Sequence, residues 1–384
     1  FNAFAAPSGL IFFNSGLIRT VENEDQLLGV LAHEVGHVAN RHISSRASKQ
    51  GKLTAATLLL GLASLATGNV ALTQGLLTGV MATGATLGLS FSREDEEQAD
   101  RFAYDRMCAM QRDPVAMRDM LKTMRRITRY RSEQLPPYLL THPNPEDRLL
   151  YVQSLLELAQ RTPTDAPPVR RDDFAFLRFK YRVMTQSLDP EQLRVYYTKR
   201  MADDNTDQAT LARYGMALLH AEEGDFARAI DQLERVRQAY PQQRILEIDQ
   251  ASLYLDSGQP AKAADTLRWA YERDPTDSYV VFASARRAEQ QGQLAQAERL
   301  YLEAARMLPE YPQLYYNLGR LKARQGENGV SNFYLAKYYL YQGRMDYAKQ
   351  YLKQTAKARA GDIPDALQQE AEAILKRLKE LEDI

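Results

Sequence analysis

The chain has 384 residues, of which 45% are hydrophobic and 26% are charged. These values are typical of a soluble globular protein with two domains, and they exclude a disordered chain and one embedded in a membrane throughout. The 49 basic residues equal the 49 acidic ones, so charge gives no reason to expect nucleic acid as a partner. The single cysteine, Cys108, excludes a disulfide within the chain, and we expect it to be a small buried residue of a helix.

The first residues predict a small β element followed by a helix. Residues 1–20 alternate apolar residues with Gly, Ser and Pro, which is typical of a short strand pair or of a strand and a turn. From Asn23 onward apolar residues recur at helical spacing as far as Val35. No signal peptide opens the chain, and because it begins at Phe1 without Met we expect part of the first domain to be missing.

Residues 53–92 contain no charged side chain. A single spanning helix needs about 20 strongly apolar residues, whereas glycines interrupt every candidate run in this stretch. We therefore expect two short helices, 53–66 and 70–88, that form a hairpin packed on the protein. The alternative is a surface that touches lipid, which would give the chain a peripheral contact with a membrane.

Helices with many charged residues follow this stretch. The sequence predicts one helix from Arg93 towards Met110 and another from Asp113 to near Arg131. Prolines then predict a loop over residues 136–145, and a helix from Glu146 ends the first domain, 1–160. Residues 161–173 have the composition of a linker.

An internal repeat with a period of 34 residues fills the second domain, 174–384. The residues that recur in one register are Gly224, Gly258, Gly292 and Gly326, with Ala229, Ala263 and Ala297, and with Pro241, Pro275 and Pro309. Glycine at the turn, alanine where paired helices touch and proline after the second helix resemble the tetratricopeptide repeat. We expect a divergent helix pair at 174–202, an extra helix near 312–326 before a last repeat, and a capping helix at 363–382.

The segment His33-Glu34-Val35-Gly36-His37 carries the chemistry. On a helix, His33 and His37 lie one turn apart on the same face, so both imidazoles can bind one metal ion, and Glu34 beside them can accept a proton from water. A hydrolytic zinc site needs a third protein ligand. The remaining histidines are His42, His142 and His220, of which His42 falls on a different part of the helix and His220 on a repeat helix. Glu96 is another candidate, with Asp100 one turn later to orient a histidine.

In order along the chain, these motifs resemble peptidase family 48, which includes HtpX, the CAAX prenyl protease and Oma-type proteases. The residues that carry the resemblance are Asn2-Ala3-Phe4-Ala5, His33-Glu34-x-x-His37, Glu96-x-x-x-Asp100 and Thr141-His142-Pro143.

The resemblance implies the fold and the roles of these residues. It implies a mainly α protein: a gluzincin-like metallopeptidase domain with a small β element, then an α-solenoid of tetratricopeptide repeats. It implies one Zn²⁺ per chain, with His33, His37 and Glu96 as ligands. Glu34 is then the catalytic base, Asp100 supports a ligand, and Asn2 and Ala3 lie on a strand that pairs with substrate.

His142 has two implied roles. In repeat-bearing periplasmic members of the family the matching histidine is implied as a fourth ligand that keeps the enzyme latent, and in other members as a catalytic residue that stabilises the oxyanion. The alternative is a loop histidine that makes no catalytic contact.

We therefore expect a zinc endopeptidase, located in the periplasm by resemblance, that cleaves unfolded or misassembled envelope proteins. The repeats would bind substrate or the outer-membrane assembly machinery, and a cluster of tyrosines between residues 334 and 351 would line a peptide groove or fill the repeat core. The alternative function is a latent protease that acts as a chaperone or scaffold for outer-membrane protein assembly.

Overall fold

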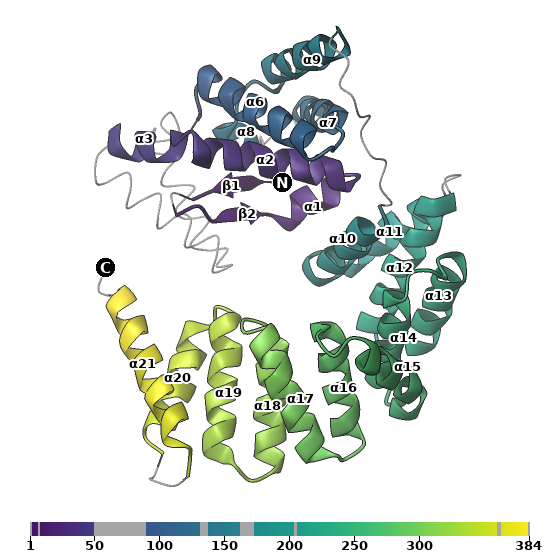
Figure 1. Cartoon of the computed structure of the whole chain (residues 1–384), viewed down its shortest axis with the longest axis vertical. Coiled ribbons are helices and arrows are strands. Elements are labelled where there is room, and N and C mark those ends of the chain that lie inside the picture. The colour runs from purple at the N-terminus through teal and green to yellow at the C-terminus, as the bar shows by residue number, and fades with distance from the viewer. Residues whose placement is uncertain are drawn as a thin grey trace. The chain divides into compact units, whose positions relative to one another are not determined.

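The computed structural model describes residues 2–6, 8–49, 90–130, 137–161, 173–202, 206–358 and 362–382. The helical hairpin expected at 53–66 and 70–88 lies outside the described residues. The chain divides into two compact units, 1–219 and 220–384. In the described part the protein is mainly helical with one two-stranded sheet, which confirms the expected fold class (Figure 1). No helix among these residues has both the length and the apolar character that crossing a membrane requires.

The sheet at the start of the first unit is an antiparallel hairpin of β1 (Ala3–Ala5) and β2 (Ile11–Phe13). Ala3 pairs with Phe13, and the Phe4 ring stacks on Phe12 with a centroid separation of 4.9 Å. The turn between the strands contains Gly9 at a φ of 84°, a left-handed conformation that glycine adopts without a steric penalty.

The centre of the first unit is α2 (Glu24–Ala39), which follows α1 (Ser15–Thr20) and runs between the sheet and α6 (Arg93–Ala109) (Figure 1). Its start follows from the sequence, because the Asn23 side chain accepts a hydrogen bond from the Gln26 amide and two acidic residues fill the first turn. α6 begins with a capping box between Ser92 and Asp95.

Four more helices surround this pair: α3 (His42–Lys49), α7 (Val115–Tyr130), α8 (Pro137–Thr141) and α9 (Pro145–Arg161). The prediction of a loop across 136–145 is wrong for α8. A proline favours the first position of a helix, so Pro137 starts this short helix instead of excluding one. Cys108 lies on a helix, α6, as expected, but its side chain is exposed, so the prediction that it is buried is wrong.

The first unit continues through α10 (Phe174–Ser187), α11 (Pro190–Met201) and most of α12 (Thr206–Glu222). Lys180 of α10 is buried, and its ammonium donates a hydrogen bond of 2.6 Å to the carbonyl of Val21 at the end of α1. This unit thus extends past the domain boundary expected at 161–173. That boundary remains a prediction, since most of the linker lies outside the described part of the chain.

The second unit is a row of antiparallel helices, each packed on the next (Figure 1). After α12 these are α13 (Phe226–Ala239), α14 (Ile245–Asp256), α15 (Pro260–Arg273), α16 (Ser278–Gln290), α17 (Leu294–Met307), α18 (Pro312–Arg324), α19 (Asn328–Tyr341), α20 (Met345–Ala356) and α21 (Asp365–Glu382).

The periodic residues have the structural roles that the repeat predicted. The glycine at each turn has a φ between 71° and 82°, and the three periodic alanines are fully buried. The helix expected near 312–326 is α18. Gly343, which follows α19, comes half a period after Gly326. Half a period is one helix, so α19 pairs both with α18 before it and with α20 after it. Of the tyrosines, Tyr334, Tyr338 and Tyr341 pack against a core cluster, which agrees with a role in the repeat core, while Tyr347 is exposed.

Candidate metal centre

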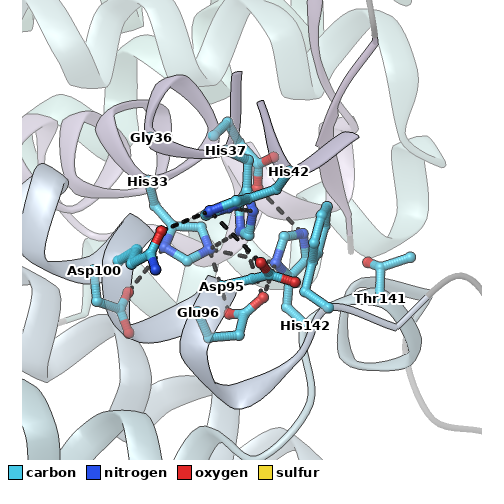
Figure 2. Close-up of polar contacts among 12 residues, drawn as sticks. His33, Gly36, His37, His42, Asp95, Glu96, Asp100, Thr141 and His142 are labelled. Atoms are coloured by element: carbon cyan, nitrogen blue, oxygen red, sulfur yellow. Dashed lines mark hydrogen bonds and ion pairs between the residues drawn. The ribbon is translucent and has the colours of Figure 1, made fainter. Parts of the chain in front are cut away.

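Two histidines of α2 point from one face of the helix towards α6, where Glu96 meets them (Figure 2). His33 Nε2 lies 3.1 Å from His37 Nε2 and 3.5 Å from one Glu96 oxygen, and His37 Nε2 lies 3.4 Å from the other. All three side chains are buried. The one-turn spacing of the motif therefore produces the convergence that the sequence predicted.

His142 joins this group from the turn after α8. Its Nδ1 atom lies 2.9 Å from a Glu96 oxygen and 3.3 Å from His33 Nε2, and Tyr138 stacks on its ring. The interpretation as a loop histidine without contact to the site is therefore wrong. The four donor atoms, one from each side chain, lie within 4.8 Å of one another.

These separations fit a metal ion. Ligand atoms about 2.0–2.2 Å from a tetrahedral zinc lie about 3.3–3.6 Å from each other, close to the spacings found here. Three imidazole nitrogens and a carboxylate are also the donor types that zinc prefers in proteins. The described residues contain one such group, and they bring together four of the side chains that the sequence singled out.

The electrostatics keep His37 and Glu96 in the form that binds a metal. Burial lowers the pKa of His37 to about 3, so its imidazole is neutral and its lone pair is free. Burial alone would raise the pKa of Glu96, but the guanidinium of Arg148 and the nearby histidines outweigh it and hold that pKa well below its ordinary value. Glu96 is therefore an anion at neutral pH.

Glu34 lies beside the donor group without belonging to it. It is buried, and its Oε1 lies 3.5 Å from His142 Nε2 and accepts no hydrogen bond from the described residues. A buried carboxylate oxygen without a hydrogen bond is costly. Its position next to the donor atoms is that of a base that takes a proton from a metal-bound water.

Asp100 and Arg148 contact two of the donor residues, His33 and Glu96. An Asp100 oxygen lies 2.8 Å from His33 Nδ1, the nitrogen that faces away from the group, as expected for a residue that orients a ligand. Arg148 of α9 is buried and bonds Asp100 at 2.7 and 2.9 Å and Glu96 at 3.0 Å. Sequence reasoning missed Arg148. The available signal was an arginine on the apolar face of α9, four residues before the buried Val152.

His42 was also misjudged from the sequence, which placed it away from the site. α2 ends at Ala39, and Arg41 adopts a φ of 56°, so the helix is interrupted and α3 starts at His42. This turn brings His42 Nδ1 to 3.0 Å from His37 Nδ1 (Figure 2). Spacing along one continuous helix could not show this contact. His220, by contrast, lies on α12 with Glu223 as its ion-pair neighbour at 3.8 Å.

The two residues expected to bind substrate lie at the hairpin. Ala3 belongs to β1 and is fully buried, and Asn2 precedes it. The Asn2 carbonyl accepts a hydrogen bond from the Asn14 amide, while its side-chain oxygen is buried and has no hydrogen-bond partner among the described residues. β1 contacts α2, the helix that carries the two histidines.

Comparison with known proteins agrees with this site. Residues 1–156 match peptidase family M48, and residues 282–329 match a tetratricopeptide repeat family. The chain therefore carries a domain that matches the M48 metallopeptidase family, followed by a match to tetratricopeptide repeats.

Among individual proteins, the chain is 29% identical over 330 residues to the beta-barrel assembly-enhancing protease of Escherichia coli K12. The aligned region covers 75% of this chain and 65% of that protein. The chain is 32% identical over 104 residues to the metalloprotease YcaL of the same organism, covering 27% of this chain and 39% of YcaL. It is 29% identical over 147 residues to the mitochondrial metalloendopeptidase OMA1 of Arabidopsis thaliana, covering 38% and 28%. The chain thus spans less than two thirds of the length of these relatives.

Proposed function

We propose that the chain is a zinc-dependent endopeptidase that cleaves unfolded or misassembled proteins of the bacterial envelope, with one Zn²⁺ held by His33, His37 and Glu96. The observation that carries this proposal is the buried set of donor atoms, with the separations of a tetrahedral zinc site, next to the carboxylate of Glu34. When bound, zinc would polarise the scissile carbonyl and acidify a water molecule.

Within this site Glu34 would take the proton from water and return it to the leaving amine. Asp100 and Arg148 would fix the orientations of His33 and Glu96 through the contacts described above. An extended substrate would add a strand beside Asn2 and Ala3, because backbone pairing selects unfolded chain over folded protein. The packing of β1 on α2 supports this proposal, because β1 lies next to the helix that carries Glu34.

The repeats would bind substrate or the machinery that assembles outer-membrane proteins, and the protein would act in the periplasm. This part of the proposal rests on the name of the E. coli relative and on the general use of such repeats in protein binding. The alternative of a lipid contact through residues 53–92 rests mostly on residues outside the described part of the chain.

A second candidate function is a latent protease that serves as a chaperone or scaffold. It is favoured by His142, whose Nδ1 atom lies among the donor atoms and would close the open position that a hydrolytic zinc site needs. Proteolysis would then require this histidine to move away.

A casein cleavage assay with the wild-type protein and the Glu34→Gln variant tests the proposed activity. We expect cleavage by the wild type and a loss of at least about 10²-fold in the variant, with zinc content unchanged, because the base is not a ligand. Equal cleavage by both proteins would refute the role of Glu34. No cleavage by a zinc-loaded wild type would favour the scaffold function.

A further inference from the structure

We infer that His42 is a positioning residue for the metal centre, which fixes the tautomer and the ring orientation of His37 through a hydrogen-bonded chain that ends on α6. The inference rests on the proposed function, in which His37 binds zinc.

The chain of contacts has two hydrogen-bonded links. His37 Nε2 faces the other donor atoms, and its second nitrogen, Nδ1, lies 3.0 Å from His42 Nδ1. His42 Nε2 lies in turn 3.1 Å from the Gln98 side-chain oxygen and 3.6 Å from an Asp95 oxygen. His42 is buried, so these side chains are its neighbours in place of solvent.

A metal bound at His37 sets the direction of every proton in this chain. With a metal bound to Nε2, the ring proton of His37 would be on Nδ1 and would be donated to His42. His42 Nδ1 must then be an acceptor, which places the His42 proton on Nε2, where the Gln98 oxygen accepts it. Each link joins one donor to one acceptor, and the opposite tautomer of His42 would set two N–H groups against each other.

The backbone supports the same conclusion. Arg41 adopts a left-handed conformation that is uncommon for a residue other than glycine, and this turn directs His42 back towards α2. The Phe91 ring also stacks on His37 at a centroid distance of 3.8 Å, so the imidazole is held on its face as well as at its outer nitrogen. Asp100 contacts the Nδ1 atom of His33 in the same way. Each of the two α2 histidines therefore has a partner at the ring nitrogen that faces away from the donor group.

Substitutions at position 42 can separate the hydrogen bond from mere packing. The amide oxygen of asparagine takes the place of a histidine Nδ1 and can accept the proton of His37, whereas the glutamine amide takes the place of Nε2 and cannot. Phenylalanine keeps the ring and removes both nitrogens. His220→Asn, the same change on α12, is the matched control.

The measurement is the zinc dissociation constant of each purified full chain, obtained by competition with a chromogenic chelator. Circular dichroism and the visible spectrum of the Co²⁺-substituted proteins accompany it. We expect His42→Phe and His42→Gln to weaken zinc binding about 10- to 100-fold and to alter the Co²⁺ spectrum. His42→Asn should stay within about threefold of the wild type, as should His220→Asn.

Equal zinc affinity in the wild type, His42→Gln and His42→Asn would overturn the inference, and so would equal losses in the Asn and Gln variants. If His42→Phe does not fold, the Asn and Gln pair still decides. A wild-type chain that binds no zinc would instead refute the proposed function, so the two failures are distinguishable.

Discussion

At the scale of single residues, His142 decides whether the resting site is open. Its Nδ1 atom lies 2.9 Å from Glu96 and within the donor group. We expect His142→Ala to keep its zinc, because three ligands remain, and to raise casein cleavage and self-cleavage severalfold, because the water position opens. Lower turnover would assign His142 to oxyanion stabilisation instead, and an unchanged rate at equal zinc content would refute both roles.

Arg148 has the largest predicted effect on stability. Its removal leaves the buried carboxylates of Glu96 and Asp100 without their cationic partner. We expect Arg148→Met to lower the free energy of unfolding of the metal-free protein by about 3–5 kcal/mol in urea titrations. The control is Arg101→Met, which breaks an exposed pair with Asp105 and should cost less than about 1 kcal/mol. Similar losses in the two variants would contradict the account.

The sequence predicted those residues of the site whose geometry follows from one helix. His33 with His37, and Glu96 with Asp100, are each one turn apart, so spacing alone places each pair on one face. His42 could not be predicted, because its place depends on the left-handed conformation of Arg41 between α2 and α3. Arg148 is likewise placed by the packing of α9 on α6; its position on the apolar face of α9 indicates burial but not its partners.

At the scale of elements, the site depends on the close approach of α2 and α6. A methyl group on Gly36 would lie 3.0 Å from the Ala99 Cα and 3.1 Å from its carbonyl oxygen, so the backbone of α6 would have to shift. We expect Gly36→Ala to destabilise the protein by about 1–3 kcal/mol despite the better helix propensity of alanine. Zinc affinity should fall as well, because the shift moves Glu96 away from His33.

Gly29→Ala on the same helix is the control. A methyl group there would meet the flexible side chains of Met117, at 3.0 Å, and Met107, at 3.5 Å. Because those side chains can adjust, we expect a change within about 1 kcal/mol and normal zinc binding. Thermal unfolding and chelator competition measure both effects, and a Gly36→Ala variant as stable as Gly29→Ala would contradict the tight contact.

Elements were predictable where a period or a cap defines them. The 34-residue period specified the turns of the second unit, and Asn23 marked the start of α2. The helix α8 was missed because prolines at 136 and 137 predict a break as readily as a helix start. The pairing of α19 with both α18 and α20 was not predicted, because it depends on how the helices pack against each other.

At the scale of the whole molecule, Lys180 tests whether α10 belongs to the first unit. Burial, and secondarily Arg200, lowers the pKa of Lys180 to about 8. Between this value and the unfolded pKa of about 10.5 the unfolded state binds more protons, so this group increases stability as pH rises. We expect the stability of the wild type relative to Lys180→Met to increase by roughly 2–3 kcal/mol from pH 7 to pH 10. A constant difference would show that Lys180 is exposed and that α10 does not pack on α1.

The central claim, a protein-bound zinc ion held by one face of α2 and by α6, is tested most directly by counting zinc. Elemental analysis and native mass spectrometry of the purified chain should give one zinc per molecule for the wild type and for Glu34→Gln. His33→Ala and Glu96→Ala should give close to none under the same conditions. Undiminished zinc in either of these two variants, or a wild type that retains none, would contradict the assignment.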